Sequence, residues 1–356
     1  MKERTQKRGA VTSDEGGPGA IDEAETGDAG AIAAPANEAS TGAAADAGAG
    51  AGHVGGALAG AVAGTVAILG RPNVGKSTLL NRIVGEKLAI VTPKPQTTRN
   101  RIVGVWNGAA GQIVFVDTPG VHGARKGLNR FMVGEAMSTI EDVEAALLVV
   151  DATDGRPGDA ERMILDGLAA AKKPVVLAIN KVDKVKDKTA MFPLLTSWNA
   201  AGNFAALVPI SATRGTNVDE LVQEICRMLP AGPPLYGPEM LTDRTERFLA
   251  AELVREQIFL RLKQELPYAT AVVIETWQER PDRGDVVIEA SILVERDSQR
   301  GIVVGAGGTM IRDVGTAARQ EIATLLGRPA HLKLEVKVAP DWSTSPEALA
   351  RLGYAR

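Results

Sequence analysis

Between residues 63 and 230, short apolar runs alternate with stretches in which apolar residues recur every three or four positions. The short runs are typical of buried strands, and the periodic stretches are typical of amphipathic helices. This alternation predicts an α/β domain with a doubly wound, mostly parallel sheet that binds ligands at the carboxyl ends of its strands. Strands are expected at 65–69, 101–106, 112–116, 144–151, 174–179 and 206–210, helices at 77–84, 160–171 and 218–229, and a hairpin turn at 107–108.

The pattern changes after residue 230. Residues 231–240 form a proline-rich linker, and residues 241–356 have their own series of elements. We expect a helix, two strands joined by a turn, a glycine-rich turn between two helices, and a final strand. This order predicts an α+β domain with the type II KH fold, which binds RNA. The helical ranges are 244–266 and about 301–326, and the strands are 271–277, 286–294 and 332–338.

Residues 1–62 differ from both of these regions. They are rich in Ala, Gly, Thr, Asp and Glu, contain no aromatic residue, and carry 4 Lys and Arg against 9 Asp and Glu. A segment of this composition cannot bury enough apolar surface to offset the entropy lost on ordering, so we expect a disordered tail. It lacks the apolar core of a secretory signal and is too weakly apolar for a membrane span.

Composition narrows the class of protein. Of the 356 residues, 45% are hydrophobic, which is enough for well-packed cores. The single cysteine, Cys226, rules out an internal disulfide framework and fits a reducing compartment. The formal net charge of −3 gives no support for nucleic-acid binding, so that function has to be inferred from local features.

The strongest chemical signal directly follows the first predicted strand. Residues 70–77 fit the phosphate-binding loop G-x-x-x-x-G-K-S/T, and a predicted helix comes next. Backbone N–H groups of such a loop and the helix N-terminus bind phosphate oxygens. Lys76 is expected to contact the β- and γ-phosphates, and the Ser77 hydroxyl to bind Mg²⁺. The candidate phosphate-binding residues are Gly70, Arg71, Pro72, Asn73, Val74, Gly75, Lys76 and Ser77.

Two further segments are placed to complete the site for magnesium and the γ-phosphate. The loop 89–99 lies where a nucleotide-sensing switch would lie, and Thr97 or Thr98 can offer a hydroxyl to Mg²⁺. We favour Thr98, because it immediately precedes an arginine. Asp117 ends a strand, where its carboxylate can hold the magnesium shell, and Gly120 can offer its N–H to the γ-phosphate. The candidate catalytic residues are Lys76, Thr98 and Gly120, the metal-binding residues are Ser77, Thr98 and Asp117, and the nucleotide-binding turn is Asp117, Thr118, Pro119 and Gly120.

A third group of residues is expected to select the base. Asp183 can accept hydrogen bonds from the N1–H and the exocyclic amine of guanine, whereas adenine presents the reverse pattern, so the site would reject adenine. Lys181 can lie along the base, and Asn180 can tie this loop to the phosphate loop. The backbone of Ser211 and Ala212 can contact the guanine oxygen. The candidate residues are Asn180, Lys181, Val182, Asp183, Ser211 and Ala212.

The glycine-rich turn at 305–308 is the candidate RNA-binding feature. A G-x-x-G turn at a helix N-terminus lets a nucleic-acid backbone approach closely, and the bases are read in an adjoining apolar groove. Arginines at 296, 300, 312 and 319 lie near this turn in the sequence. The candidate RNA-binding residues are Arg300, Gly305, Ala306, Gly307, Gly308 and Arg312.

From about residue 63 to its end, the chain resembles the Era family of bacterial ribosome-assembly GTPases. The resemblance implies GTP hydrolysis with GTP/GDP and Mg²⁺ bound, a K⁺ ion assisted by Asn73, and binding near the 3′ end of 16S ribosomal RNA. It also implies a role in 30S subunit assembly and a cytoplasmic location with peripheral membrane attachment. The family usually has lysine at the position of Ala306, so one phosphate contact is missing. The stretches that carry the resemblance are 70–77, 94–99, 117–120, 180–183, 211–213 and 295–302.

The intrinsic GTPase rate is expected to be low, because Val121 cannot orient a water molecule as a glutamine there would; His122 is expected in a surface loop. We expect a monomer. Two other functions stay open at this point. An RNA chaperone with a purely regulatory nucleotide site would release no phosphate in steady state. A membrane-attached signalling GTPase with a protein-binding KH-like domain would not co-purify with RNA.

Overall fold

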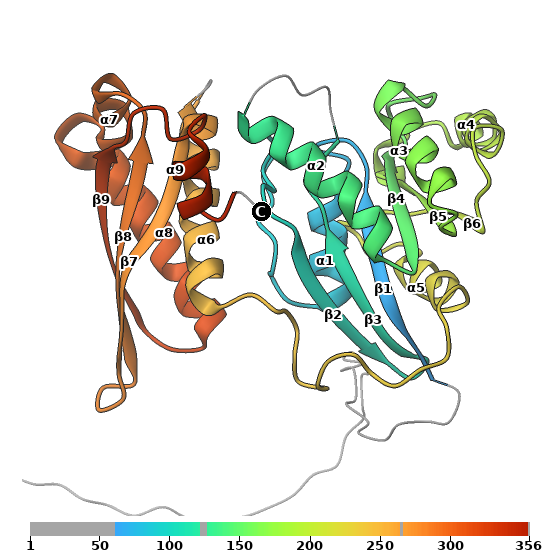
Figure 1. The fold of residues 1–356 in the computed structure, drawn as a ribbon, viewed down its shortest axis with the longest axis horizontal. Coiled ribbons are helices and arrows are strands. Elements are labelled where there is room, and N and C mark those ends of the chain that lie inside the picture. Colours follow the sequence, from blue (N-terminus) through green and yellow to red (C-terminus); the bar gives the residue numbers. More distant parts are fainter. Residues whose placement is uncertain (1–60, 122–126, 264–265, 355–356) are drawn as a thin grey trace, which may run out of the picture. The chain divides into compact units, whose positions relative to one another are not determined.

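The computed structural model describes residues 61–121, 127–263 and 266–354 (Figure 1). The tail predicted for residues 1–62 therefore lies outside the described residues except for its last two, and the second of these begins the first strand. Both predicted folds are present: a mostly parallel α/β sheet first, then a smaller α+β unit.

The first sheet has six strands in the order β2-β3-β1-β4-β5-β6. All neighbouring strands are parallel except β2 and β3, which form a hairpin. The parallel strands end at one edge, so the residues that follow these strands meet there. The strands are β1 Val62–Leu69, β2 Ile102–Gly108, β3 Gly111–Asp117, β4 Ala145–Asp151, β5 Val175–Asn180 and β6 Ala206–Pro209.

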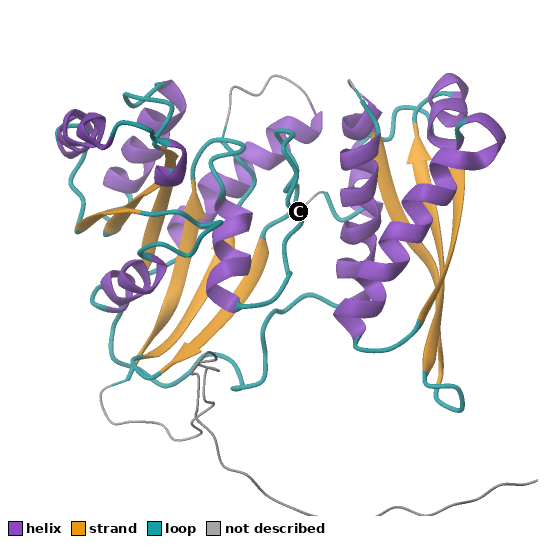
Figure 2. Cartoon of the chain, turned by 180° about the vertical axis from the view of Figure 1, so that it is seen from behind, coloured by secondary structure: helices purple, strands orange, loops and turns teal. Residues whose placement is uncertain are grey.

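Helices cover both faces of this sheet (Figure 1, Figure 2). Side chains of a strand point alternately to its two faces. In β1, Val66 and Ile68 therefore pack with α1 and α5, whereas Ala67 and Leu69 pack with the helices of the opposite face. The first face is covered by α1 Lys76–Val84 and α5 Val218–Cys226, and the second by α2 Gly127–Asp142, α3 Asp159–Ala170 and α4 Met191–Asn199.

The second sheet has three strands, with β7 antiparallel and β9 parallel to the central β8. Two long helices, α6 and α8, pack on one face of this sheet. No helix among the described residues is both long and apolar enough to cross a membrane. The elements are α6 Glu246–Arg261, β7 Thr270–Arg280, β8 Asp285–Val294, α7 Asp297–Val304, α8 Thr309–Leu326, β9 Ala330–Val338 and α9 Pro346–Arg351, with short 3₁₀ turns at Leu266–Ala269 and Ala306–Gly308.

Helices α2, α4 and α9 were not among the predicted elements. Helix α4 has a proline at position 193. Proline is tolerated in the first turn of a helix but reads as a helix breaker in the sequence. Helix α9 spans only six residues, and its place in the fold comes from packing of Leu349 on Trp342 and Tyr354.

The hairpin turn between β2 and β3 also differs from its prediction. Strand β2 continues through Asn107 and Gly108, which pair with Gln112 and Gly111, so the turn consists of the two alanines at 109–110. Asn107 is used for a different purpose. Its Oδ1 accepts a hydrogen bond of 2.8 Å from Gln112 Nε2, and its Nδ2 donates one of 3.1 Å to the carbonyl oxygen of Pro238.

The hairpin gives a prediction about stability. Gly111 has φ 141, and an added Cβ would lie 1.9 Å from the carbonyl oxygen of Val62. Gly111→Ala should therefore lower the free energy of unfolding by about 2 kcal/mol or more, measured by urea denaturation. Gly134→Ala in α2 is the matched control. An added Cβ there meets no atom within 4 Å, so this change should be neutral or stabilise by up to ~1 kcal/mol. Equal effects of the two changes would contradict this account.

Candidate functional site

The phosphate loop connects β1 to α1 and depends on two glycines with left-handed backbone. Gly70 has φ 144, and a Cβ on it would lie 2.2 Å from the carbonyl oxygen of Val149. Gly75 has φ 103, and a Cβ there would lie 2.3 Å from Nδ2 of Asn180. Both positions therefore require glycine, because any side chain would push the loop off the neighbouring strands.

The side chain of Lys76 lies inside this loop. Its Nζ donates hydrogen bonds of 3.1 and 3.0 Å to the carbonyl oxygens of Gly70 and Arg71. Burial lowers the pKa of the Lys76 ammonium to about 8, and the carboxylate of Asp117 opposes that shift. The ammonium is thus positioned where anionic ligand oxygens would replace the lost solvation.

Arg71 does not face the phosphate loop's interior. Its guanidinium pairs with Asp154 at 2.6 Å and with the buried carboxylate of Glu161 in α3. Glu161 in turn accepts a hydrogen bond of 3.0 Å from the N–H of Gly158 at the start of α3. The side chain of Arg71 therefore anchors the loop to α3, and what it can offer a phosphate is its backbone N–H.

The three predicted magnesium-binding residues lie together. Ser77 Oγ is 2.9 Å from Thr98 Oγ1 and donates a hydrogen bond of 2.6 Å to Asp117 Oδ2. Thr97, the alternative to Thr98, instead bonds to Thr92 and to the carbonyl oxygen of Lys94. The geometry therefore favours Thr98.

Asp117 shows that this group of oxygens suits a cation. Its side chain is fully buried, and Oδ1 accepts no hydrogen bond from the described residues. Burial raises the pKa of this carboxyl to about 6, although Lys76 and the hydrogen bond from Ser77 act in the opposite direction. A buried oxygen without a partner beside two hydroxyls is the donor set that Mg²⁺ binds together with phosphate oxygens.

The turn after β3 approaches the phosphate loop closely. A Cβ on Gly120 would lie 2.6 Å from the backbone nitrogen of Pro72, so only glycine fits. Thr118 does not face the phosphate side, because its Oγ1 donates to the carbonyl oxygen of Ile68 at 2.8 Å. The side chain of Val121 is fully buried, and His122 lies outside the described residues.

The candidate base-binding residues lie at the end of β5 and in the segments that follow β5 and β6. Asn180 Nδ2 donates to the carbonyl oxygen of Val74 at 2.8 Å, and its Oδ1 accepts from the N–H of Ala212 at 2.9 Å. Asp183 Oδ1 accepts from Ser211 Oγ at 2.6 Å. This hydrogen bond lowers the pKa of the Asp183 carboxyl, so the group is ionised at neutral pH. A half-buried, ionised acceptor beside the buried Asn180 is what selection of guanine requires.

Sequence reasoning missed the role of Asp151. Its Oδ2 lies 2.6 Å from Lys181 Nζ, which also donates to the carbonyl oxygen of Asn73 at 2.6 Å. Asp151 therefore positions the lysine that is expected to lie along the base. The signal was available, because Asp151 ends a buried strand at the same edge of the sheet as Asp117.

A cavity of about 360 Å³ lies beside the phosphate loop, and Lys181 is the one base-binding candidate that lines it. Residues of the phosphate loop, the segment 90–98, Gly120 and Lys181 line it. A cavity of this size, with backbone N–H groups and a few convergent polar side chains, is typical of a small-molecule site. Among the described residues, no group of three or more His, Cys, Asp and Glu side chains could hold a metal ion, so a cation here would depend on the single carboxylate of Asp117, the hydroxyls of Ser77 and Thr98, and phosphate oxygens.

The segment 94–99 has contacts that the sequence did not reveal. The guanidinium of Arg99 is 2% exposed and donates to the carbonyl oxygens of Pro267, Tyr268 and Thr270 at 3.3, 3.0 and 2.7 Å. Lys94 Nζ donates to the carbonyl oxygens of Phe259 in the last turn of α6 and of Leu262, which follows this helix. Arg99, which directly follows Thr98, is thus buried among residues of the α+β unit that contains the second sheet.

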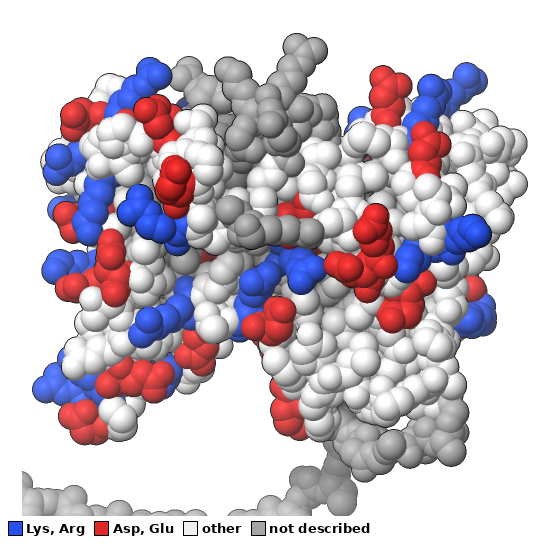
Figure 3. Space-filling view, viewed as in Figure 1, with Lys and Arg blue, Asp and Glu red and all other residues white. Residues whose placement is uncertain are grey.

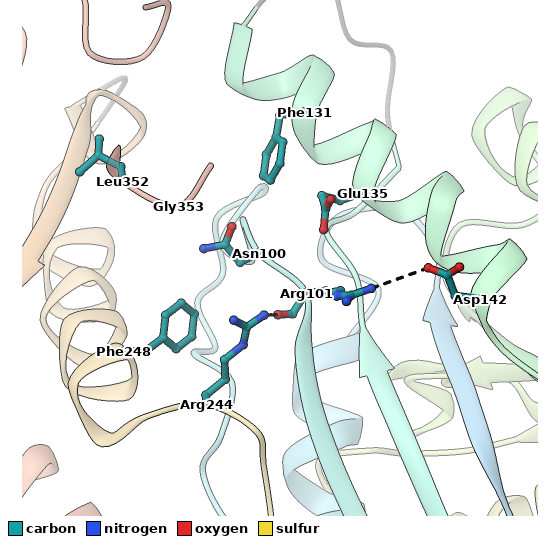
Figure 4. Close-up of a pocket in the computed structure, with 9 residues that line it drawn as sticks. All are labelled: Asn100, Arg101, Phe131, Glu135, Asp142, Arg244, Phe248, Leu352 and Gly353. Carbon is teal, nitrogen blue, oxygen red and sulfur yellow. Dashed lines mark hydrogen bonds and ion pairs between the residues drawn. The ribbon is translucent and has the colours of Figure 1, made fainter. Parts of the chain in front are cut away.

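A second cavity, of about 430 Å³, lies beside the end of this segment (Figure 4). Arg244 lines it, and its Nη2 donates to the carbonyl oxygen of Arg101 at 2.5 Å, while Arg101 Nη1 lies 3.9 Å from Asp142 Oδ2 of α2. None of the residues predicted to bind nucleotide lines this cavity. It is therefore separate from the nucleotide site.

The predicted RNA-binding turn lies between α7 and α8. Gly305, Gly307 and Gly308 have φ 74, 59 and 75, which favour glycine. A Cβ on Gly307 or Gly308 would meet no atom within 4 Å, so a ligand backbone can approach there. Ile302, which sequence reasoning missed, is 54% exposed and supplies apolar surface next to the turn.

The arginines near this turn are exposed. Within the described part of the chain, neither Arg300 nor Arg312 forms an ion pair, so both guanidiniums are available to phosphates. Figure 3 shows Lys and Arg interspersed with Asp and Glu on the face that it presents, without one large field of either sign.

Two protein-family models match the chain. One is described as a 50S ribosome-binding GTPase and covers residues 65–181, and the other is the KH domain, over residues 265–343. GTPase Era of Geobacter metallireducens is 50% identical over 289 residues, which cover 81% of this chain and 96% of that relative. GTPase Era of Lacticaseibacillus paracasei is 47% identical, with 81% and 95% covered.

Two solved structures are similar over 83% of this chain and 100% of their own length. A variant of Aquifex aeolicus Era bound to GDP and AlF4⁻ has a TM-score of 0.80 and 40% identity. Era in complex with MgGDPNP and nucleotides 1506–1542 of 16S ribosomal RNA has a TM-score of 0.79 and 39% identity.

The raised pKa of Asp117 predicts how stability depends on pH in the nucleotide-free protein. Ionisation of this carboxyl is less favourable in the folded chain than in the unfolded chain, so it destabilises the fold above pH 6. The penalty disappears as the pH falls toward the unfolded pKa of about 4. Asp117→Asn should therefore raise the free energy of unfolding by roughly 2 kcal/mol at pH 7.5 and by less than about 1 kcal/mol at pH 4.

Urea denaturation at the two pH values measures this difference. The control is Asp166→Asn, which changes an exposed carboxylate on α3 and should have no such pH-dependent effect. In titrations with GTP and Mg²⁺ the effect of Asp117→Asn should reverse, because a charged ligand of the cation is lost. A stabilisation of the Asn variant that is equal at both pH values would contradict the assigned burial of the charge.

Proposed function

This chain belongs to the Era family of GTPases, and on that basis we propose that it binds the 3′ region of 16S ribosomal RNA and acts in assembly of the 30S subunit. It is a GTPase, which hydrolyses GTP to GDP and phosphate. The observation that carries the proposal is the combination of two sites in one chain. A phosphate loop, a magnesium-binding group and a guanine-selective loop meet at one sheet edge. A G-x-x-G turn follows in the second unit, beside arginines that form no ion pair with any described residue.

Each residue of the nucleotide site has a role in this proposal. Lys76 and the backbone N–H groups of residues 70–77, except Pro72, stabilise the charge on the γ-phosphoryl group as it passes to water. The N–H of Gly120 is offered to the same group. Mg²⁺, held by Ser77, Thr98 and Asp117, supplies further neutralisation of the phosphate oxygens. The buried, apolar side chain of Val121 cannot orient the attacking water, so a low intrinsic rate is expected.

The RNA site is proposed at the glycine-rich turn. The crystallised Era that binds nucleotides 1506–1542 of 16S ribosomal RNA covers 83% of this chain, including its KH region. Gly305, Gly307 and Gly308 would let the RNA backbone approach, and Arg300 and Arg312 would neutralise phosphates. Accumulation of unprocessed 30S precursors on depletion of this protein would test the assembly role.

Three finer features belong to the same proposal. Asn73 Nδ2 donates a hydrogen bond of 3.0 Å to the carbonyl oxygen of Pro93, so its amide oxygen is left for K⁺. Faster GTP hydrolysis in KCl than in NaCl would support this role.

The protein is proposed to be a cytoplasmic monomer with peripheral membrane attachment, which fractionation of cells at low and high salt can test. We propose that the GTPase domain spans 63–230, the linker 231–240 and the KH domain 241–356.

The base-selecting role of Asp183 can be tested by substitution. Asp183→Asn replaces one charged acceptor that faces two guanine donors, so it should weaken GTP binding by roughly 10²-fold, since each such hydrogen bond contributes ~1.5 kcal/mol. The same change should improve binding of xanthosine triphosphate, whose C2 oxygen can accept from the new amide. Fluorescence titration with both nucleotides measures the switch.

Asp187→Asn is the matched control, because asparagine also caps the short turn that Asp187 begins. It should leave both affinities unchanged. An unaltered GTP affinity in the Asp183→Asn variant would place the guanine site elsewhere.

The RNA-binding role of the turn can be tested at Ala306. Ala306→Lys adds one ammonium where lysine is usual in the family, so binding to a 3′ fragment of 16S ribosomal RNA should tighten at low salt. The slope of log affinity against log salt should steepen by about 0.7. Base preference and GTP affinity should not change, because backbone contacts position the strand without reading it. Filter binding over a salt series measures both quantities.

The control adds the same charge elsewhere on α8. Gln320→Lys places an ammonium on the exposed side of the helix, three turns beyond Gly308. It should not change the affinity or the slope. If the two variants behave alike, the turn does not contact phosphate, and RNA binding has to be assigned to another surface.

A further inference from the structure

Arg82 joins the first helix of the nucleotide site to the loop that follows β6. It lies in the last turn of α1, the helix that begins at Lys76. Its Nε donates to the carbonyl oxygen of Ala212 at 3.2 Å, and its Nη2 donates to the carbonyl oxygen of Thr213 at 2.5 Å. Two successive carbonyl groups of the loop are thus held by one planar guanidinium.

These contacts fix the direction of a backbone donor. In a planar trans peptide, the C=O of Ala212 and the N–H of Thr213 point to opposite sides. Because Arg82 holds the Ala212 carbonyl toward α1, the N–H of Thr213 is directed away from that helix. Within the described residues this N–H makes no hydrogen bond.

The other donors of the loop already have acceptors. The N–H of Ala212 donates to Asn180 Oδ1 at 2.9 Å, and the N–H of Arg214 lies 3.3 Å from Ser211 Oγ. Ser211 Oγ itself donates to Asp183. Thr213 lies beside this pair, because its Oγ1 is 3.3 Å from Ser211 Oγ. Among residues 212–214, the N–H of Thr213 is therefore the donor that has no acceptor within the described residues and remains for a ligand.

We propose that Arg82 is a positioning residue for guanine recognition, which aims the Thr213 N–H at the O6 oxygen of the base. This inference rests on the proposed guanine site. Asp183 then reads the N1–H and the amine of guanine, while Thr213 reads its carbonyl oxygen. Adenine has an amino group where guanine has O6, so two hydrogen-bond donors would face each other at Thr213. This mismatch adds to the selectivity for guanine over adenine.

The choice of arginine follows from the geometry. A guanidinium presents parallel donors that can hold two carbonyl oxygens at once, whereas a lysine ammonium acts as a point charge. Its place in the last turn of α1 is also favourable for a cation. Because α1 starts at the phosphate loop, one rigid helix carries a phosphate contact at its first residues and holds the base loop near its end.

Affinities of three diphosphates for the full chain test the proposal. The diphosphates are GDP, IDP, which lacks only the 2-amino group, and 6-thio-GDP, which replaces O6 by a weakly accepting sulfur. Arg82→Ala should weaken GDP and IDP alike, by about tenfold, and should change 6-thio-GDP by less than about twofold, since sulfur is a poor acceptor. Arg82→Lys should lose part of the GDP affinity.

The control is Arg227→Ala, which removes an exposed arginine paired with Glu224 on α5 and should change none of the three affinities. Thermal unfolding of each variant monitors the fold. Equal losses for all three diphosphates would show that Arg82 only supports the domain, and an unchanged GDP affinity would show that it does not position the loop; either result overturns the inference. If the unmodified chain does not prefer GDP over ADP, the proposed guanine site itself is wrong.

Discussion

The nucleotide site depends on the buried side-chain amide of Asn180, which is 2% exposed. Its Nδ2 holds the carbonyl oxygen of Val74 in the phosphate loop, and its Oδ1 holds the N–H of Ala212 in the base loop. An amide is suited to this position because it has one donor and one acceptor group on a short stem. Loss of either bond would leave a buried backbone group unpaired, at a cost of ~1–3 kcal/mol.

Gly75 of the phosphate loop lies in close contact with the side chain of Asn180. Gly75 can lie so close to Asn180 only because it has no Cβ, and the same glycine begins α1 with the N–H groups that face phosphate. The loop proposed to select the base and the loop proposed to bind phosphate are therefore fixed relative to one another through Asn180. Arg82, at the other end of α1, makes a second connection between this helix and the base loop, through the carbonyl oxygens of Ala212 and Thr213.

Arg99 extends this set of contacts beyond the nucleotide site. Its guanidinium lies 5.9, 5.6 and 5.8 Å from the ring centroids of Phe259, Trp342 and Tyr354. Burial lowers the pKa of Arg99 from its usual high value, and three backbone carbonyls and these rings replace the lost water. The carbonyl oxygens and rings that surround this cation thus belong to the second unit. Its neighbour Thr98 contacts Ser77 in the nucleotide site.

Much of this arrangement could be predicted from the sequence, because parallel strands bring the residues that follow them to one edge. That rule placed Lys76, Asp117 and Asp183 together without any knowledge of contacts. It also applied to Asp151, whose role was nevertheless missed because no motif includes it. The contacts of Arg99 and Arg82 could not be predicted, because each depends on which residues far away in the chain present carbonyl oxygens at that place.

Charge is the property that the composition describes least well. The chain carries a formal net charge of −3, which argues against RNA binding if cations are merely counted. The structure shows why the count misleads. On the second sheet, Lys333 and Lys337 pair with Glu289 and Glu275, so their charges are neutralised locally. Arg300 and Arg312, beside the glycine-rich turn, have no such partner among the described residues, so they can neutralise phosphates without first losing an ion pair.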